Sequence, residues 1–242
     1  MQSILDIVFP KTCSICSRKG SYLCERCKKL FKRTLPECYG CRRLSSDYTT
    51  HGKYKELKRI SALDHVFVCW EYNSLTADLL KRYKYNYVYD LAGTLSEFFI
   101  ENISNSSFLS VLEGSILTNV PISSNRLRER GFNQTLEVSK TLANRLNIPF
   151  SEDILKRRNS YGHQSLKDRD ERKALSYKDF VVNSNFNISS YKSITVIDDV
   201  ITTGSTLESI CFCLKKFWGE DLIVNAACMF RGRAYYLKQT NQ

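Results

Sequence analysis

The sequence predicts an α/β protein, with a mainly parallel, twisted sheet flanked by helices and a small cysteine-rich module at the N-terminus. From residue 65 onward, short β-branched runs alternate with amphipathic helical stretches, which indicates βαβ units and a parallel sheet. Six of the ten cysteines fall within the first 41 residues, all in C-x-x-C pairs. The expected organisation is a module over 1–44, a linker over 45–64 and a sheet domain over 65–242.

The clustered cysteines follow the spacing C-x2-C-x7-C-x2-C-x10-C-x2-C, and they are Cys13, Cys16, Cys24, Cys27, Cys38 and Cys41. In a reducing compartment such pairs point to metal rather than to disulfides. Four thiolates satisfy a tetrahedral zinc ion and leave no open position, so the first two pairs are the expected ligands of one structural Zn²⁺ in a ribbon-like module. A zinc ion shared between the first and third pairs is the alternative. If the first two pairs share the zinc ion, Cys38 and Cys41 are expected to stay a reduced, unligated pair. A second site needs about four ligands, and only His51 offers a further one nearby.

Basic residues concentrate in the N-terminal quarter of the chain. Residues 1–60 hold 14 lysines and arginines against 5 acidic residues, whereas the remainder holds 22 against 20. This imbalance favours single-stranded DNA or another polyanion as a partner, and a merely solvated basic face is the alternative. Among these charges, Phe31 is expected to be core, whereas Tyr22 and Tyr39 suit either core packing or base stacking.

The N-terminus carries no pattern of a secretory signal, because Met1–Pro10 lacks a basic start and has only a short apolar stretch. No run of about 18 apolar residues occurs that would span a bilayer. The expected location is therefore the cytoplasm, without integral membrane association.

The sheet domain is expected to contain four strands and four helices, placed by apolar periodicity and by capping residues. The strands are His65–Tyr72, Ser115–Pro121, Ser193–Ile197 and Leu222–Phe230. The helices are Ser74–Tyr83, Asp90–Ile103, Asn133–Leu146 and Ser205–Phe217.

The most informative stretch is Ile194–Thr206, with the sequence ITVIDDVITTGST. A mainly apolar strand ends in Asp198 and Asp199, and a loop of small and hydroxyl-bearing residues then enters a helix. Backbone N–H groups at a helix N-terminus bind phosphate, and Gly204 permits close approach. The paired carboxylates suit the hydroxyls of a ribose diol. An Asp-Asp helix cap followed by a glycine turn is the structural alternative.

Arginines alternate after another strand end, at Arg126, Arg128 and Arg130. Fork-shaped guanidinium donors are the expected chemistry for binding pyrophosphate and stabilising it as it leaves, and an exposed basic loop is the alternative.

A polar, basic stretch over 156–172 contains Arg157, Arg158 and His163. It is expected to be a loop that closes over the ligand and excludes water. Within it, His163 is expected to be an exposed loop residue rather than an acid or base.

The stretch Ile194–Thr206 resembles the signature with which type I phosphoribosyltransferases bind 5-phosphoribosyl-1-pyrophosphate (PRPP). The resemblance implies a type I phosphoribosyltransferase fold, Mg²⁺ bound together with PRPP, and Asp198 and Asp199 on the ribose 2′ and 3′ hydroxyls, with Arg126 beside them in the catalytic set. It also implies a 5′-phosphate loop that comprises Thr202, Thr203, Gly204, Ser205 and Thr206.

The order of motifs along nearly the whole chain is similar to that of the competence protein ComF (ComFC) family. Three C-x-x-C pairs precede RERGFNQ at Arg128–Gln134, then HQSL at His163–Leu166, then the PRPP segment; the fourth C-x-x-C pair of many relatives is absent. The resemblance implies a phosphoribosyltransferase-like protein in natural transformation, supporting uptake or cytoplasmic handling of single-stranded DNA beside the helicase ComFA. A non-catalytic adapter that senses PRPP or a nucleotide and binds DNA stays open, as does nucleobase salvage. The sequence does not name a phosphoribosyl acceptor.

Overall fold

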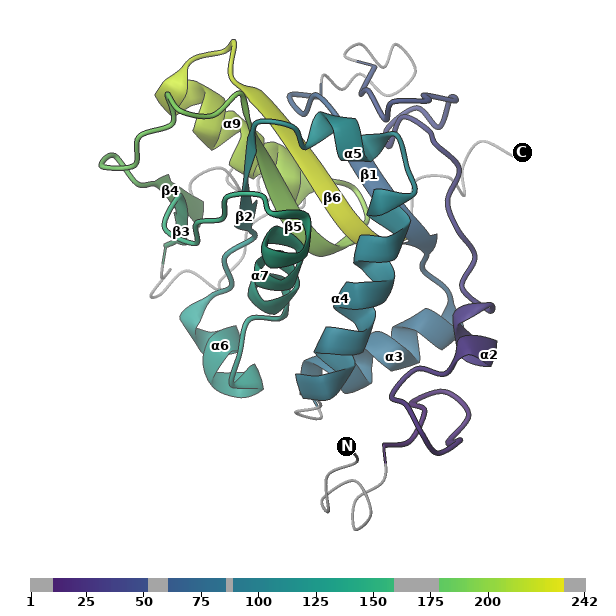
Figure 1. The fold of residues 1–242 in the computed structure, drawn as a ribbon. Coiled ribbons are helices and arrows are strands. Elements are labelled where there is room, and N and C mark those ends of the chain that lie inside the picture. The colour runs from purple at the N-terminus through teal and green to yellow at the C-terminus, as the bar shows by residue number, and fades with distance from the viewer. Residues whose placement is uncertain (1–10, 52–60, 86–88, 159–178, 233–242) are drawn as a thin grey trace, which may run out of the picture.

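A four-stranded, all-parallel sheet lies at the centre of the computed structural model, which describes residues 11–51, 61–85, 89–158 and 179–232 (Figure 1). The strands are β1 (Val66–Glu71), β2 (Ser115–Asn119), β5 (Ser193–Ile201) and β6 (Ile223–Arg231), in the order β1-β6-β5-β2. The inner strands are buried along most of their length, as strands of parallel sheets are, except for Asp198, Asp199 and Val200 of β5 and the two end residues of β6. The predicted α/β architecture is confirmed.

Helices cover both faces of the sheet (Figure 1). On one face α4 (Tyr89–Ser104) packs on α7 (Gln134–Leu146), with α3 (Ser74–Tyr85) beside α4. On the other face α9 (Ser205–Trp218) packs on β6, and each face has its own hydrophobic core. The buried Val138 and Leu142 of α7 show the expected amphipathic spacing. Among the described residues, no helix is long and apolar enough to cross a bilayer.

Several short elements were not predicted as such from the sequence. They are α2 (Glu25–Lys28), α5 (Phe108–Val111), α6 (Ser124–Arg130), β3 (Leu155–Arg157) and β4 (Phe180–Val182). Strands β3 and β4 form a separate antiparallel pair, and β4 lies against α9. The α6 segment was expected to be a loop, but it is helical because Ser123 caps its start and Gly131 ends it with φ 74°.

The described part of the cysteine-rich module packs directly on the β1 edge of the sheet. The Phe31 ring lies 5.4 Å from that of Trp70 and 5.6 Å from that of Phe98, both edge-on. Next to it, the Thr34 N–H donates to the Cys69 carbonyl of β1 at 3.0 Å. Phe31 is therefore a core residue, as predicted, but its core is that of the sheet and not a separate core of the module.

The described parts of the expected linker, 45–51 and 61–64, are also fixed to the sheet. The Val66 N–H donates to the Tyr48 carbonyl at 3.0 Å, and the Thr50 N–H donates to the Asp64 carbonyl at 2.7 Å. The Tyr48 ring is buried against Phe67, with 5.2 Å between centroids. The boundaries at 44 and 64 remain predictions.

Candidate functional site

Strand β5 runs past both acidic residues of the predicted site. The sequence suggested a strand that ends before Asp198, whereas the structure extends it to Ile201. The physical reason is that β6 continues alongside, with Val200 opposite Phe230, and that the Gly232 N–H donates to the Ile201 carbonyl at 2.8 Å. The two carboxylates thus belong to the strand itself and not to the loop after it.

The loop between β5 and α9 forms a small hollow that is open to solvent. Its lining consists of Asp198 and all of residues 200–207, which include the five predicted phosphate-loop residues. Gly204 is the N-cap residue directly before α9 and has φ 75°, a conformation that side-chain-bearing residues rarely adopt. The Thr203 and Ser205 hydroxyls lie 2.7 Å apart, and the first N–H groups of α9 have no carbonyl partner within the helix. This arrangement can receive a phosphate group.

The two acidic residues take different positions. Asp198 lines the hollow and its Oδ1 accepts the Asp199 N–H at 2.8 Å. Adjacent side chains of a strand point to opposite faces, so Asp199 is directed toward the face covered by α3. In agreement, the pKa of the buried Tyr83 of α3 is raised by burial and then by the Asp199 charge. Asp198 therefore lines this candidate phosphate hollow, formed by Asp198 and residues 200–207, whereas Asp199 points to the opposite face at the same edge of the sheet.

The alternating arginines lie on α6, which follows β2 at the same edge of the sheet. Strand β2 ends with Asn119 opposite Ile197, the residue before Asp198. Arg126 and Arg128 are exposed, and the Arg128 guanidinium donates to the Asn125 side chain at 2.6 Å. Arg130 is half-buried and donates to the Gln134 side chain at 3.1 Å.

Arg157 and Arg158 lie at the end of β3. The Arg157 guanidinium packs 5.5 Å from the Phe180 ring centroid and 3.6 Å from Asp179, and the Arg158 N–H donates to the Asp179 carbonyl at 2.8 Å. The rest of the predicted closing loop, with His163, lies outside the described residues.

Two residues beside the phosphate hollow, Tyr39 and Glu208, were not predicted to belong to this site. The Tyr39 hydroxyl donates to the Glu208 carboxylate, and a Cβ at Gly204 would lie only 2.8 Å from Tyr39 Cε2. The Glu208 carboxylate also accepts the Ser61 hydroxyl at 2.6 Å and the Ala62 N–H at 2.9 Å. Burial raises the pKa of this carboxyl to about 7, against the lowering effects of the Ala62 N–H and Lys215. The signal in the sequence that could have revealed Glu208 is an acidic residue between Leu207 and Ser209, two positions of α9 that are buried.

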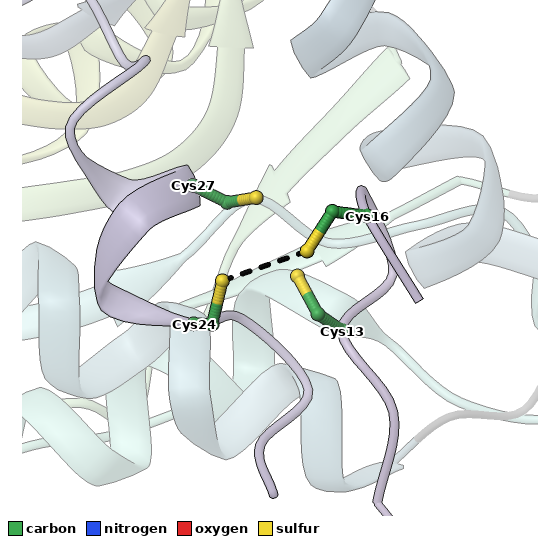
Figure 2. A group of neighbouring side chains, drawn as sticks. All are labelled: Cys13, Cys16, Cys24 and Cys27. Carbon is green, nitrogen blue, oxygen red and sulfur yellow. Dashed lines mark hydrogen bonds between the residues drawn. The ribbon is translucent and has the colours of Figure 1, made fainter. Parts of the chain in front are cut away.

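The first two C-x-x-C pairs converge on one point, as Figure 2 shows. The sulfur atoms of Cys13, Cys16, Cys24 and Cys27 all lie within 4.8 Å of one another. The Cys16 and Cys24 sulfurs are 3.7 Å apart, close to the edge of about 3.8 Å that Zn–S bonds of about 2.3 Å give a tetrahedron. This group can hold a metal ion. The structure brings the first pair together with the second pair and places the third pair in a separate group with His51.

Two thiols of this cluster have pKa values that are shifted in opposite directions. Burial alone would raise the pKa of Cys13, but backbone N–H groups of Cys24, Cys16 and Ile15 lower it to about 6. The pKa of Cys27 is raised to about 12, by burial and then by the neighbouring thiols. Neighbouring thiolates repel, so the four sulfurs can all be ionised only around a cation.

Comparison with known proteins agrees with this geometry. Residues 134–241 match the phosphoribosyl transferase domain family. Competence protein F of Haemophilus influenzae is 30% identical over 207 residues, which are 84% of this chain and 88% of that protein. Competence protein ComFC of Streptococcus pneumoniae is 26% identical over 205 residues, 84% of this chain and 85% of that protein. Among solved structures, a hypoxanthine phosphoribosyltransferase of Staphylococcus aureus overlaps loosely, with 14% identity and a TM-score of 0.36 over 58% of this chain and 64% of that chain.

The parallel sheet, the β5–α9 loop and the matched domain define a protein of the type I phosphoribosyltransferase fold with an N-terminal cysteine module. The chain belongs to the competence protein ComF (ComFC) family.

Proposed function

We propose that this chain binds PRPP with Mg²⁺ and acts in natural transformation, where it supports uptake or cytoplasmic handling of single-stranded DNA. The single observation that carries the PRPP proposal is the hollow formed by Asp198 and residues 200–207. Helix N–H groups and hydroxyls on one side suit the 5′-phosphate, while a carboxylate at the rim suits a ribose hydroxyl. The role in transformation follows from the names of the relatives in Haemophilus influenzae and Streptococcus pneumoniae.

The remaining parts of the ligand suit other groups at this edge of the sheet. The arginines of α6 follow β2, the neighbour of β5, and fork-shaped donors suit a pyrophosphate. Mg²⁺ prefers oxygen ligands and commonly bridges phosphate groups to a carboxylate, and Asp198 and Asp199 are the carboxylates that we propose for this role. Catalysis at the anomeric carbon then requires positioning and electrostatics.

For the DNA partner, the support is electrostatic. Arg18, Lys19, Arg26 and Lys29 are all exposed on the described part of the module. Phe31 and Tyr39 are buried, so they are not available for base stacking, and Tyr22 is half-buried. Binding is therefore proposed to follow the phosphates, with the helicase ComFA as a further partner. For the four-cysteine cluster we propose structural Zn²⁺, because four thiolates leave no open position.

Replacing Asp198 and Asp199 by asparagine tests the PRPP proposal. The variant keeps the side-chain shape but loses charge-assisted bonds of about 1.5–3 kcal/mol each, so PRPP affinity should fall by roughly two decades or more. Calorimetric titration of PRPP with Mg²⁺ measures this, after both proteins are shown to melt alike. The exposed Asp221, at the other end of β6, gives the matched control Asp221→Asn, which should bind as the unmodified chain does.

Equal binding by Asp198→Asn/Asp199→Asn and the unmodified chain contradicts the assignment of the site. If PRPP binding is lost but transformation is undiminished, the PRPP site stands and its link to DNA uptake is contradicted. Release of pyrophosphate that needs Mg²⁺ and an added acceptor distinguishes turnover from ligand sensing.

A further inference from the structure

The third C-x-x-C pair has the same backbone turn as the first. In both, the N–H of the first cysteine donates to the carbonyl five residues later, and its own carbonyl accepts the N–H from four residues later. Around Cys13 these two bonds measure 2.8 and 2.8 Å, and around Cys38 they measure 2.9 and 3.0 Å. The first turn contributes two sulfurs to the four-cysteine cluster, so the second turn has the geometry of a metal-binding turn.

Two unusual details repeat as well. The residue four positions after the first cysteine has a positive φ without being glycine, 60° at Ser17 and 63° at Arg42. Such a conformation is uncommon for residues that carry a Cβ. Each turn is also flanked by an isolated antiparallel bridge at equivalent positions, Thr12 with Lys19 and Glu37 with Leu44. The two turns therefore agree in hydrogen bonds, φ angle and flanking bridge, and not only in the spacing of their cysteines.

A third candidate ligand meets the second turn. His51 Nδ1 lies 3.0 Å from Cys41 Sγ, and the His51 N–H donates to Cys38 Sγ at 3.3 Å. The three ligand atoms all lie within 4.8 Å of one another. Two sulfurs and an imidazole nitrogen suit Zn²⁺, around which the S–N separation would open to about 3.6 Å. The three residues leave the fourth tetrahedral position to a ligand outside this set.

The second turn rests directly on the phosphate hollow. Tyr39 lies between the two cysteines, its ring contacts the position of Gly204, and its hydroxyl donates to Glu208 in the first turn of α9. The Tyr39 carbonyl accepts from the Arg231 guanidinium at the end of β6. These contacts link the turn to the start of α9, where the phosphate would bind.

We propose that Cys38, Cys41 and His51 bind a second divalent metal ion, and that this ion fixes Tyr39 and thereby the conformation of the loop at Gly204. Binding would release the thiol protons and replace the Cys41–His51 contact by two bonds to the metal. Because coupling between two sites is reciprocal, a phosphate in the hollow would strengthen metal binding by the same factor. The metal site stands without the proposed function, whereas the coupling rests on it.

Metal content tests the site. The purified full chain should hold two Zn²⁺ per chain, and His51→Ala and Cys41→Ser should each hold one. The matched control is Cys213→Ser, a half-buried cysteine of α9 outside both groups, which should keep two. Substitution by Co²⁺ adds a spectroscopic test, because thiolate-to-cobalt charge-transfer absorption should fall in Cys41→Ser and persist in Cys213→Ser. One equivalent in the unmodified chain, or two in His51→Ala, would overturn the second site.

Ribose 5-phosphate is the probe for the coupling. Its affinity, measured by calorimetry, should fall about tenfold in His51→Ala and in Tyr39→Ala, within the usual range of coupling between sites. The Tyr39→Ala variant should retain two metal ions, which separates loss of the contact from loss of the ion. Equal affinity in the unmodified chain and His51→Ala, with the metal count reduced to one, would overturn the coupling. No binding by the unmodified chain would overturn both the coupling and the proposed phosphate loop, while the metal count still decides the site.

Discussion

At the scale of single residues, the unexpected group is the carboxyl of Glu208. Burial raises its pKa from an ordinary 4.5 to about 7, although the Ala62 N–H and Lys215 act in the opposite direction. A carboxyl with a higher pKa in the folded than in the unfolded chain favours folding when it is protonated. Its contribution is fully present below the unfolded pKa and is lost as the pH rises through about 7.

As the pH rises from about 4.5 to about 7, ionisation of Glu208 should therefore lower the free energy of unfolding by at most about 3 kcal/mol. Glu208→Gln should remove most of that slope, because an amide does not ionise. Thermal unfolding at pH 5.5 and at pH 8.5 measures the effect. Glu220→Gln, an exposed neighbour near the end of α9, should retain the slope of the unmodified chain. Parallel pH dependence of Glu208→Gln and the unmodified chain would contradict the prediction.

The sequence predicted that Asp198 and residues 202–206 lie together, and they do line one hollow, because they are close along the chain. Their role in binding a ribose 5-phosphate group stays a prediction. The sequence did not predict the contact between Tyr39 and Glu208, which are 169 positions apart. Likewise, the repeated turn at Cys13 and Cys38 is a similarity of φ angles and hydrogen bonds, because the two turns share little beyond their cysteines. Contacts and backbone angles of this kind come from tertiary packing, which local patterns do not specify.

At the scale of elements, long periodic segments were predictable and short ones were not. Helices α7 and α9 begin at or within one residue of their predicted starts, since apolar periodicity and capping act together over several turns. Helix α6 has only seven residues and no buried ones, so no apolar stripe marked it in the sequence. Its helical geometry changes the prediction for the arginines, because residues four apart share a face and residues two apart do not.

Arg126 and Arg130 share one face of α6, and Arg130 donates to the Gln134 side chain. The Gln134 carbonyl accepts the Tyr83 hydroxyl, and the Asp199 charge acts on Tyr83. This face of α6 is therefore the one directed toward Asp199. Arg128 is on the other side. We expect Arg126→Ala to weaken pyrophosphate binding about 10- to 100-fold, the value of one charge-assisted bond. Arg128→Ala, equally exposed on the same helix, is the control and should change little. Calorimetry with pyrophosphate and Mg²⁺ measures both, and a larger loss in Arg128→Ala would reverse the assignment of the faces.

At the scale of the whole molecule, the cysteine module and the sheet share one interior. Phe31 packs on Trp70 and Phe230, and Tyr39 packs on the loop before α9. Removing the first 60 residues would therefore expose the β1 edge and both cores to water, at a cost of about 25 cal/mol for each Å² of apolar surface. Truncation would therefore test the proposed DNA binding only together with unfolding, so charge reversal on the intact fold is the sharper experiment.

Arg18, Lys19 and Lys29 are exposed, and their replacement by glutamate leaves the buried residues of the module in place. Single-stranded DNA affinity falls with salt at a slope of roughly −0.7 per neutralised phosphate, so losing three contacts should make the slope shallower by about 2. Fluorescence anisotropy with an oligothymidine over a series of salt concentrations measures this slope. Glutamate at the exposed Lys140, Lys192 and Lys216 changes the net charge equally and serves as control. If both triple variants change the slope alike, DNA responds to the net charge of the chain, whereas a loss confined to the first variant places the phosphate contacts on the module.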